Sequence, residues 1–140
     1  MAVGYWCDSL ATRQRFAGDR IRSGDVYTCC DDGYYTYLGR SDDMLRVSGE
    51  WVSPAEVEAV LVMHPAVLEA AVVGYRDDQG VLRPVAYIVA APGRTVDPAE
   101  LEIHCKSELA GYKRPRRYEV IAELPKTATG KIQRFKLRTP

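Results

Sequence analysis

Residues 38–49, Leu-Gly-Arg-Ser-Asp-Asp-Met-Leu-Arg-Val-Ser-Gly, separate two parts of the chain that differ in pattern. The residues before this stretch are rich in glycine and turn-forming residues and show weak periodicity, whereas helical and extended patterns follow it in order. Short, polar segments are typical of the connections between structural units. We therefore interpret the stretch as a joint, although a hairpin turn with solvent-exposed charges would have the same local pattern.

Directly after the joint, the pattern predicts a hairpin and then a helix. Residues 44–47 and 50–52 alternate like two short strands that turn at Ser48-Gly49. Ser53-Pro54-Ala55-Glu56 follows, with an N-cap serine, a proline in the first turn and a glutamate three residues after the cap. This is the pattern of a helix start, and Pro65 predicts where the helix stops.

The rest of the chain predicts a small sheet with helices packed on it. The apolar runs 67–74 and 84–91 flank a turn, which predicts an antiparallel hairpin, and residues 118–122 predict a third strand. A second helix start lies at Asp97-Pro98-Ala99-Glu100, and residues 133–138 predict a short basic helix. The expected fold class is α+β: about three main strands plus a two-stranded hairpin, with helices packed on the sheet.

Upstream of the joint, one hairpin is predicted. Asp31-Asp32-Gly33 separates two tyrosine-containing runs, the second of which, residues 34–38, is strand-like. Little in residues 1–37 could close a hydrophobic core without other chain segments.

The charge is balanced overall but unevenly distributed. The chain has 19 basic and 19 acidic residues, yet the segment from Lys106 onward carries a net charge of +7. Such a segment favours an anionic partner such as a phosphate, although it could also be a solvated face. Nucleic-acid binding is disfavoured, because the net charge is zero and the basic tail lacks interleaved aromatic residues.

The four cysteines and the apolar runs bear on the cellular compartment of the chain. No Cys-x-x-Cys pair and no neighbouring histidine cluster occur, so a metal site is not expected. No apolar run approaches the roughly 20 residues of a membrane span, and residues 1–8 are too short and uncharged for a signal peptide. Reduced thiols and a cytoplasmic location are therefore expected, with no membrane partner.

The loop Pro125-Lys126-Thr127-Ala128-Thr129-Gly130-Lys131-Ile132 contains a Gly-Lys pair but is not a Walker A loop. That motif needs a second glycine five residues earlier and Ser or Thr after the lysine, where Pro125 and Ile132 stand here. Two interpretations of Lys131 are left. It could be a cation on a loop able to move, where it meets a phosphate or a carboxylate, or it could be an ordinary surface lysine.

Three motifs in this order resemble the adenylate-forming family, which includes acyl-CoA synthetases, luciferases and adenylation domains of peptide synthetases. They are Ser23-Gly24-Asp25, then Gly39-Arg40-Ser41-Asp42-Asp43 with Gly49 following, then residues 125–131. Residues 50–58 and 131–138 most resemble the benzoate-CoA ligase branch. The resemblance covers nearly the whole chain.

The resemblance implies roles in adenylation for five residues. Lys131 matches the catalytic lysine that bridges the substrate carboxylate and the α-phosphate of ATP. Asp25 and Arg40 match residues that bind the nucleotide. Asp42 and the adjacent Asp43 match the hinge about which the C-terminal domain rotates.

The resemblance also implies a CoA site. Gly49 matches a glycine that lines the pantetheine channel, and Tyr112, Arg114 and Arg116 match positions that hold the CoA nucleotide in aromatic-acid ligases. A lysine at the reacting carboxylate would obstruct thiol attack there, so a domain that swings between two poses is physically reasonable.

The same resemblance implies a domain organisation and a set of partners. Residues 1–38 would be the remnant of a large N-terminal AMP-binding domain, 39–43 the hinge and 44–140 the lid domain. The expected function is the C-terminal portion of an ATP-dependent carboxylic acid:CoA ligase, for an aromatic acid such as benzoate, with medium-chain fatty acids left open.

ATP and CoA would be substrates, and Mg²⁺ would be bound outside this chain. The isolated chain is expected to be inactive without the large domain, which is its expected partner. The alternative is a non-catalytic lid module that binds CoA, a nucleotide or a protein partner.

Overall fold

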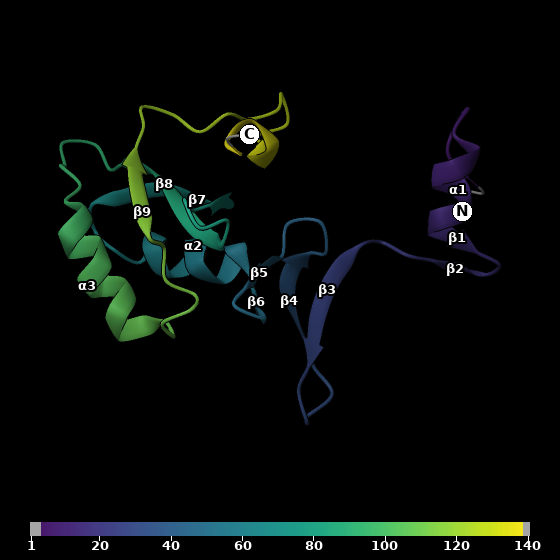
Figure 1. Ribbon diagram of the computed structural model, residues 1–140. Coiled ribbons are helices and arrows are strands. Elements are labelled where there is room, and N and C mark those ends of the chain that lie inside the picture. The colour runs from purple at the N-terminus through teal and green to yellow at the C-terminus, as the bar shows by residue number, and fades with distance from the viewer. Residues whose placement is uncertain (1–3, 139–140) are drawn as a thin grey trace. The chain divides into compact units, whose positions relative to one another are not determined.

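The computed structural model describes residues 4–138, and the chain divides into two compact units. We call Met1–Asp42 the N-terminal unit and Asp43–Pro140 the C-terminal unit. Figure 1 shows the elements of each unit.

The N-terminal unit consists of a short helix and two hairpins. Helix α1 spans Ser9–Arg15, the strands β1 (Phe16–Ala17) and β2 (Arg20–Ile21) pair antiparallel, and β3 (Asp25–Cys29) pairs antiparallel with β4 (Tyr35–Arg40). The predicted hairpin around Gly33 is confirmed. Helix α1 was not predicted, because it has only seven residues and none of them is buried. Of the residues described in this unit, only Gly39 is buried.

The C-terminal unit contains a hairpin, two α-helices, a three-stranded sheet and a short 3₁₀ helix. In chain order these are β5 (Leu45–Val47), β6 (Glu50–Val52), α2 (Pro54–Val62), β7 (Val67–Arg76), β8 (Leu82–Ala90), α3 (Pro98–Glu108), β9 (Arg117–Val120) and η1 (Arg134–Lys136). The sheet order is β7-β8-β9, with β7 antiparallel and β9 parallel to β8. The predicted α+β fold is confirmed.

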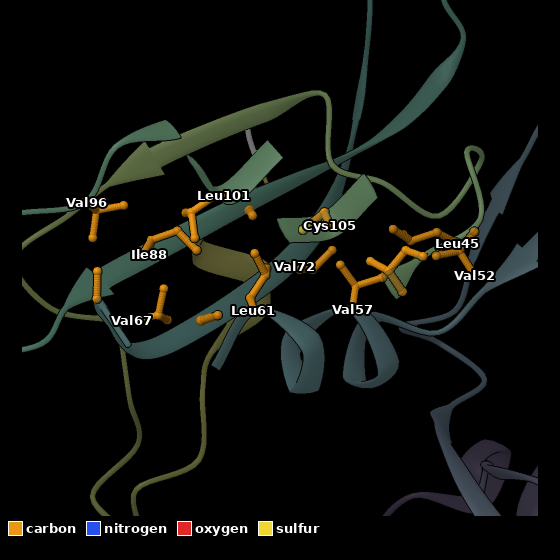
Figure 2. Packing of buried hydrophobic residues seen from close by; sticks show 14 of the residues in the cluster. Leu45, Val52, Val57, Leu61, Val67, Val72, Ile88, Val96, Leu101 and Cys105 are labelled. Atoms are coloured by element: carbon orange, nitrogen blue, oxygen red, sulfur yellow. The ribbon is translucent and has the colours of Figure 1, made fainter. Parts of the chain in front are cut away.

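The two faces of this sheet are covered differently. Alternate residues of a strand point to opposite faces, so Ala70 and Val72 contribute to the main core, whereas Ala71 belongs to a second cluster. Helices α2 and α3 cover the first face, where Val57, Leu61, Leu101 and Cys105 are fully buried (Figure 2). The segment after β9 covers the second face (Figure 1).

The two helix starts form as their sequences predict. The Oγ atom of Ser53 accepts a hydrogen bond from the Glu56 amide at 3.2 Å, and the carboxylate of Asp97 accepts one from the Ala99 amide at 2.8 Å. Helix α3 ends at Glu108, three residues before Gly111. The short helix predicted over 133–138 is a 3₁₀ turn of three residues.

No helix among residues 4–138 combines the length and apolarity that a membrane-spanning helix requires.

Candidate functional site

Lys131 lies at the end of a tight, internally hydrogen-bonded loop. The Thr127 amide donates to the Lys131 carbonyl at 2.8 Å, the Gly130 amide donates to the Thr127 carbonyl at 2.9 Å, and the Lys131 amide donates to the Thr127 hydroxyl at 3.1 Å. Gly130 adopts a φ of +81°, which favours glycine over any residue with a Cβ atom. The hydroxyl and glycine residues of this loop therefore hold the backbone of Lys131 in a defined conformation.

The flanks of this loop are attached to the sheet. Lys126 forms a 2.6 Å ion pair with Glu69 of β7, and the Gln133 amide donates to the Pro125 carbonyl at 2.8 Å. Leu124 is buried in the second cluster, and Ile132 packs against that cluster. The loop is thus a fixed projection from the second face of the sheet.

The Lys131 side chain is exposed and makes no hydrogen bond or ion pair with any residue in 4–138. It borders a shallow hollow of about 320 Å³ whose other walls include Asp43, Thr127, Arg134 and Phe135. An ammonium group without a bound carboxylate is available to an anionic ligand that approaches this hollow.

Arg114 and Arg116 line a different hollow of the C-terminal unit, of about 460 Å³, beside α3 and the start of β9. Arg114 is already engaged, because its Nε donates to the Leu109 carbonyl at 2.8 Å and its Nη2 to the Lys106 carbonyl at 3.2 Å. These bonds satisfy carbonyls at the C-terminal end of α3. The Arg116 side chain is exposed, and its amide donates to the Pro84 carbonyl.

The neighbouring charges of this hollow are partly paired. Lys106 forms a 2.8 Å ion pair with Glu102, and this ammonium lowers the pKa of the Glu102 carboxyl. Arg117 pairs with Glu119 at 2.6 Å. Arg116 therefore has fewer close partners than the cations around it.

Tyr112 lies on the loop between α3 and β9 and is 37% exposed. The neighbouring Lys113 forms hydrogen bonds of 2.6 and 2.9 Å to both carboxylate oxygens of Glu56 in α2, and its ammonium lies 5.9 Å from the Tyr112 ring centre. This bidentate contact attaches the loop to the first turn of α2.

Gly49 forms the turn of the β5–β6 hairpin with Ser48. Both residues have positive φ values, +51° for Ser48 and +92° for Gly49, as a two-residue hairpin turn requires. A Cβ atom added to Gly49 would meet no atom of the described chain within 4 Å beyond its immediate neighbours. The backbone conformation, rather than close packing inside this chain, explains the glycine.

In the N-terminal unit the structure brings Asp25, Arg40 and Asp42 together. Asp25 and Arg40 face each other across β3 and β4, and the Arg40 guanidinium lies 3.9 Å from the carboxylates of both Asp25 and Asp42. A Cβ atom on Gly24 would lie 2.5 Å from the Arg15 guanidinium. The glycine of the Ser-Gly-Asp motif therefore lets the Arg15 guanidinium lie close to the backbone of Gly24.

The predicted hinge range of 39–43 begins inside β4, which includes Gly39 and Arg40. The division between the two units falls between Asp42 and Asp43. Asp43 accepts a 2.8 Å hydrogen bond from Arg138 and lies 3.7 Å from Arg134. The hinge role of both aspartates stays a prediction.

Within residues 4–138, no three His, Cys, Asp or Glu side chains gather closely enough to hold a metal ion.

The ion pair between Glu58 and Arg134 was not predicted. Its members are 76 residues apart, with contacts of 2.7 and 3.0 Å. Both lie inside segments that carry the family resemblance, but no spacing rule pairs residues so distant in the chain.

The family model for the AMP-binding enzyme C-terminal domain matches residues 56–131. Benzoate--CoA ligase of Thauera aromatica is 55% identical over 99% of this chain and 27% of that protein. The 4-hydroxybenzoate--CoA/benzoate--CoA ligase of Rhodopseudomonas palustris is 46% identical over 98% of this chain and 26% of that protein. The chain thus spans about a quarter of the length of these curated relatives.

Solved structures of two CoA ligases contain the same fold as this chain. The anthranilate CoA ligase AuaEII in complex with anthranoyl-AMP superposes with a TM-score of 0.92 at 49% identity, covering 96% of this chain and 27% of that chain. A benzoate CoA ligase from Burkholderia xenovorans LB400 gives a TM-score of 0.87 at 48% identity, covering 98% of this chain and 28% of that chain.

These matches confirm the resemblance to the adenylate-forming enzymes and, among them, to the benzoate-CoA ligases. The family model covers more than half of the residues, and the relatives cover nearly all of them. The chain belongs to the family of AMP-binding enzyme C-terminal domains.

Proposed function

We propose that this chain is the lid domain of an ATP-dependent carboxylic acid:CoA ligase that acts on an aromatic acid such as benzoate. The observation that carries the proposal is the exposed ammonium of Lys131 on an ordered loop, in a chain of this family. The substrates are ATP, CoA and the carboxylic acid. Four free thiols agree with a cytoplasmic location.

In the first step, Lys131 bridges the substrate carboxylate and the α-phosphate of ATP. Negative charge develops between these two groups during adenylation, and a positioned cation lowers the free energy of that transition state. Asp25 accepts hydrogen bonds from the ribose hydroxyls, and Arg40, which lies beside it, contacts the same nucleotide. A large N-terminal domain outside this chain supplies the acyl pocket.

In the second step, the lid rotates about Asp42 and Asp43 and presents a different surface. Gly49 lines the pantetheine channel, and Tyr112 and Arg116 hold the CoA nucleotide, with Arg114 fixed against the end of α3. Lys131 and the two arginines line separate hollows, which agrees with one pose for ATP and another for CoA.

A chimera tests this function directly. This chain would replace the matching C-terminal segment of the Thauera aromatica benzoate--CoA ligase, and benzoate-dependent exchange of pyrophosphate with ATP would be measured. We expect an active chimera, and Lys131→Ala should lower the exchange by about 100-fold or more, the usual effect of removing one positioned electrostatic group. Thioester formation from preformed benzoyl-adenylate should stay within about threefold.

Lys136→Ala is the matched control, because Lys136 is an exposed lysine five residues further along the same segment. It should leave both half-reactions within about twofold of the parent chimera. Equal losses of both half-reactions in Lys131→Ala would refute the role of Lys131. An inactive chimera, together with CoA binding by the chain in calorimetry, would favour the non-catalytic binding module.

A further inference from the structure

The guanidinium of Arg134 joins two carboxylates from distant parts of the C-terminal unit. Its Nη2 lies 2.7 and 3.0 Å from the two oxygens of Glu58, and its Nε lies 3.2 Å from one of them. Its Nη1 lies 3.7 Å from the carboxylate of Asp43. Arginine suits this arrangement because its planar fork of donors matches carboxylate geometry.

Glu58 is itself fixed from a third direction. Its Oε1 accepts a 2.8 Å hydrogen bond from the amide of Val72 in β7. Strand β7 is an edge strand of the described sheet, with β8 on one side only, and the Val72 amide bonds to Glu58 where a second neighbouring strand would otherwise accept. The Glu58 side chain is only 13% exposed, and its charge is therefore held between the sheet edge and Arg134.

This ion pair connects the two layers that cover the sheet. Glu58 belongs to α2 on the first face, and Arg134 begins the 3₁₀ helix of the segment on the second face. Among the described residues, the main core contains 15 buried residues, whereas the second cluster contains three, with four partly buried residues packed against them: Ala71, Val89 and Leu124, then Tyr87, Ile121, Ile132 and Leu137. Because free energy from apolar burial scales with buried area, the second layer depends more on its polar contacts.

Arg134 is three residues from Lys131 along the chain, and three residues of fully extended chain span at most roughly 10 Å. We propose that Arg134 is a positioning residue for Lys131: by bridging Glu58 and Asp43, it holds the lysine loop at a fixed place on the C-terminal unit. The same guanidinium contacts Asp43, so the anchor of the loop and the predicted hinge share one carboxylate. This inference rests on the proposed function where it concerns catalysis.

Loss of the guanidinium has two consequences. The Glu58 carboxylate loses its countercharge in a mostly buried place, and the segment that carries Lys131 loses its connection to α2. A displaced Lys131 stabilises the adenylation transition state less well, which lowers kcat, whereas binding of the carboxylic acid changes little. The thioester step does not use Lys131 and should be spared.

Hydrogen exchange on the full chain tests the anchor without any activity. Arg134→Gln should raise amide exchange in residues 127–133 by about tenfold or more and leave α3 unchanged. Arg134→Lys should give a smaller increase, because a lysine keeps the charge but cannot form the fork. Lys136→Gln removes a charge two residues away on the same 3₁₀ helix and should change nothing. Unchanged exchange in 127–133, or an equal rise throughout α2 and α3, would overturn the proposal.

The chimera tests the catalytic consequence. Arg134→Gln should lower kcat for adenylation by about tenfold or more, with the KM for benzoate and the thioester step within about twofold. Adding Glu58→Gln to this variant should lower kcat for adenylation by less than about a further twofold, because the two residues act as one pair. Equal losses in both half-reactions would overturn the positioning role. An inactive parent chimera counts against the proposed function alone, and the exchange measurement then decides the anchor.

Discussion

Cys105 and Tyr118 place ionisable groups inside the main core. The Cys105 side chain is fully buried, and the Tyr118 hydroxyl is buried without a hydrogen-bond partner among the described residues. Burial raises the pKa of the Cys105 thiol above its usual value of 9.0, and burial beside that thiol raises the pKa of Tyr118 above 10.0. Both groups are therefore neutral in the folded protein at neutral pH.

These shifts predict a loss of stability in alkali. The unfolded chain ionises the cysteine above about pH 9 and the tyrosine above about pH 10, whereas the folded chain keeps both protons, so the free energy of unfolding falls as the pH rises. Tyr118→Phe should make this fall less steep above about pH 10. At about pH 7 it should change the free energy of unfolding by less than about 1 kcal/mol, because the lost hydroxyl had no partner.

Urea denaturation of the chain at several pH values measures this effect. Tyr112→Phe is the control, because Tyr112 is partly exposed and should leave the alkaline slope unchanged. A slope in Tyr118→Phe equal to that of the parent chain would contradict the prediction.

Among the secondary-structure elements, α2 depends on its N-terminal cap. Ser53 is 3% exposed and its hydroxyl accepts from the Glu56 amide, which otherwise lacks an intrahelical partner. Ser53→Ala should lower the free energy of unfolding by about 1 kcal/mol. Ser107→Ala, at an exposed position of α3, should change it by less than about 0.5 kcal/mol. Chemical denaturation compares the two, and equal effects would show that the cap is not the cause.

At the scale of the whole molecule, the two units differ in their cores. Every buried hydrophobic residue of the described chain lies between Leu45 and Leu124, inside the C-terminal unit. The N-terminal unit exposes large side chains of its β3–β4 hairpin, including Tyr34 and Tyr35. The C-terminal unit therefore has the hydrophobic core that an independent domain needs, and the described residues of the N-terminal unit do not form one.

A truncated chain tests this difference. Residues 43–140 alone should unfold cooperatively, with a Tm within about 5 °C of the full chain, whereas residues 1–42 alone should show no cooperative transition. Circular dichroism during heating measures both. Leu101→Ala in the truncated chain should lower stability by about 2 to 5 kcal/mol, because Leu101 is fully buried. Absence of a cooperative transition in residues 43–140 would contradict the prediction.

The sequence by itself determined the local structure and the family. The hairpin turns at Gly33 and Gly49 and the helix starts at Ser53 and Asp97 were predicted, because their signals lie within a few consecutive residues. The order of the motifs indicated the family, which the comparisons confirm. The 3₁₀ turn at Arg134 and the seven-residue α1 were less predictable, since such short elements have little periodicity.

Only the tertiary structure decided which distant segments meet. The sequence predicted the strand that became β9 but not its parallel pairing with β8, because both edges of a hairpin can accept a strand. It did not indicate that Thr127 would bond both the carbonyl and the amide of Lys131 and so shape its loop. It did not indicate that Arg134 would bond Glu58 at the sheet edge, since charge pairs remote in the chain are brought together by the fold and leave no spacing in the sequence.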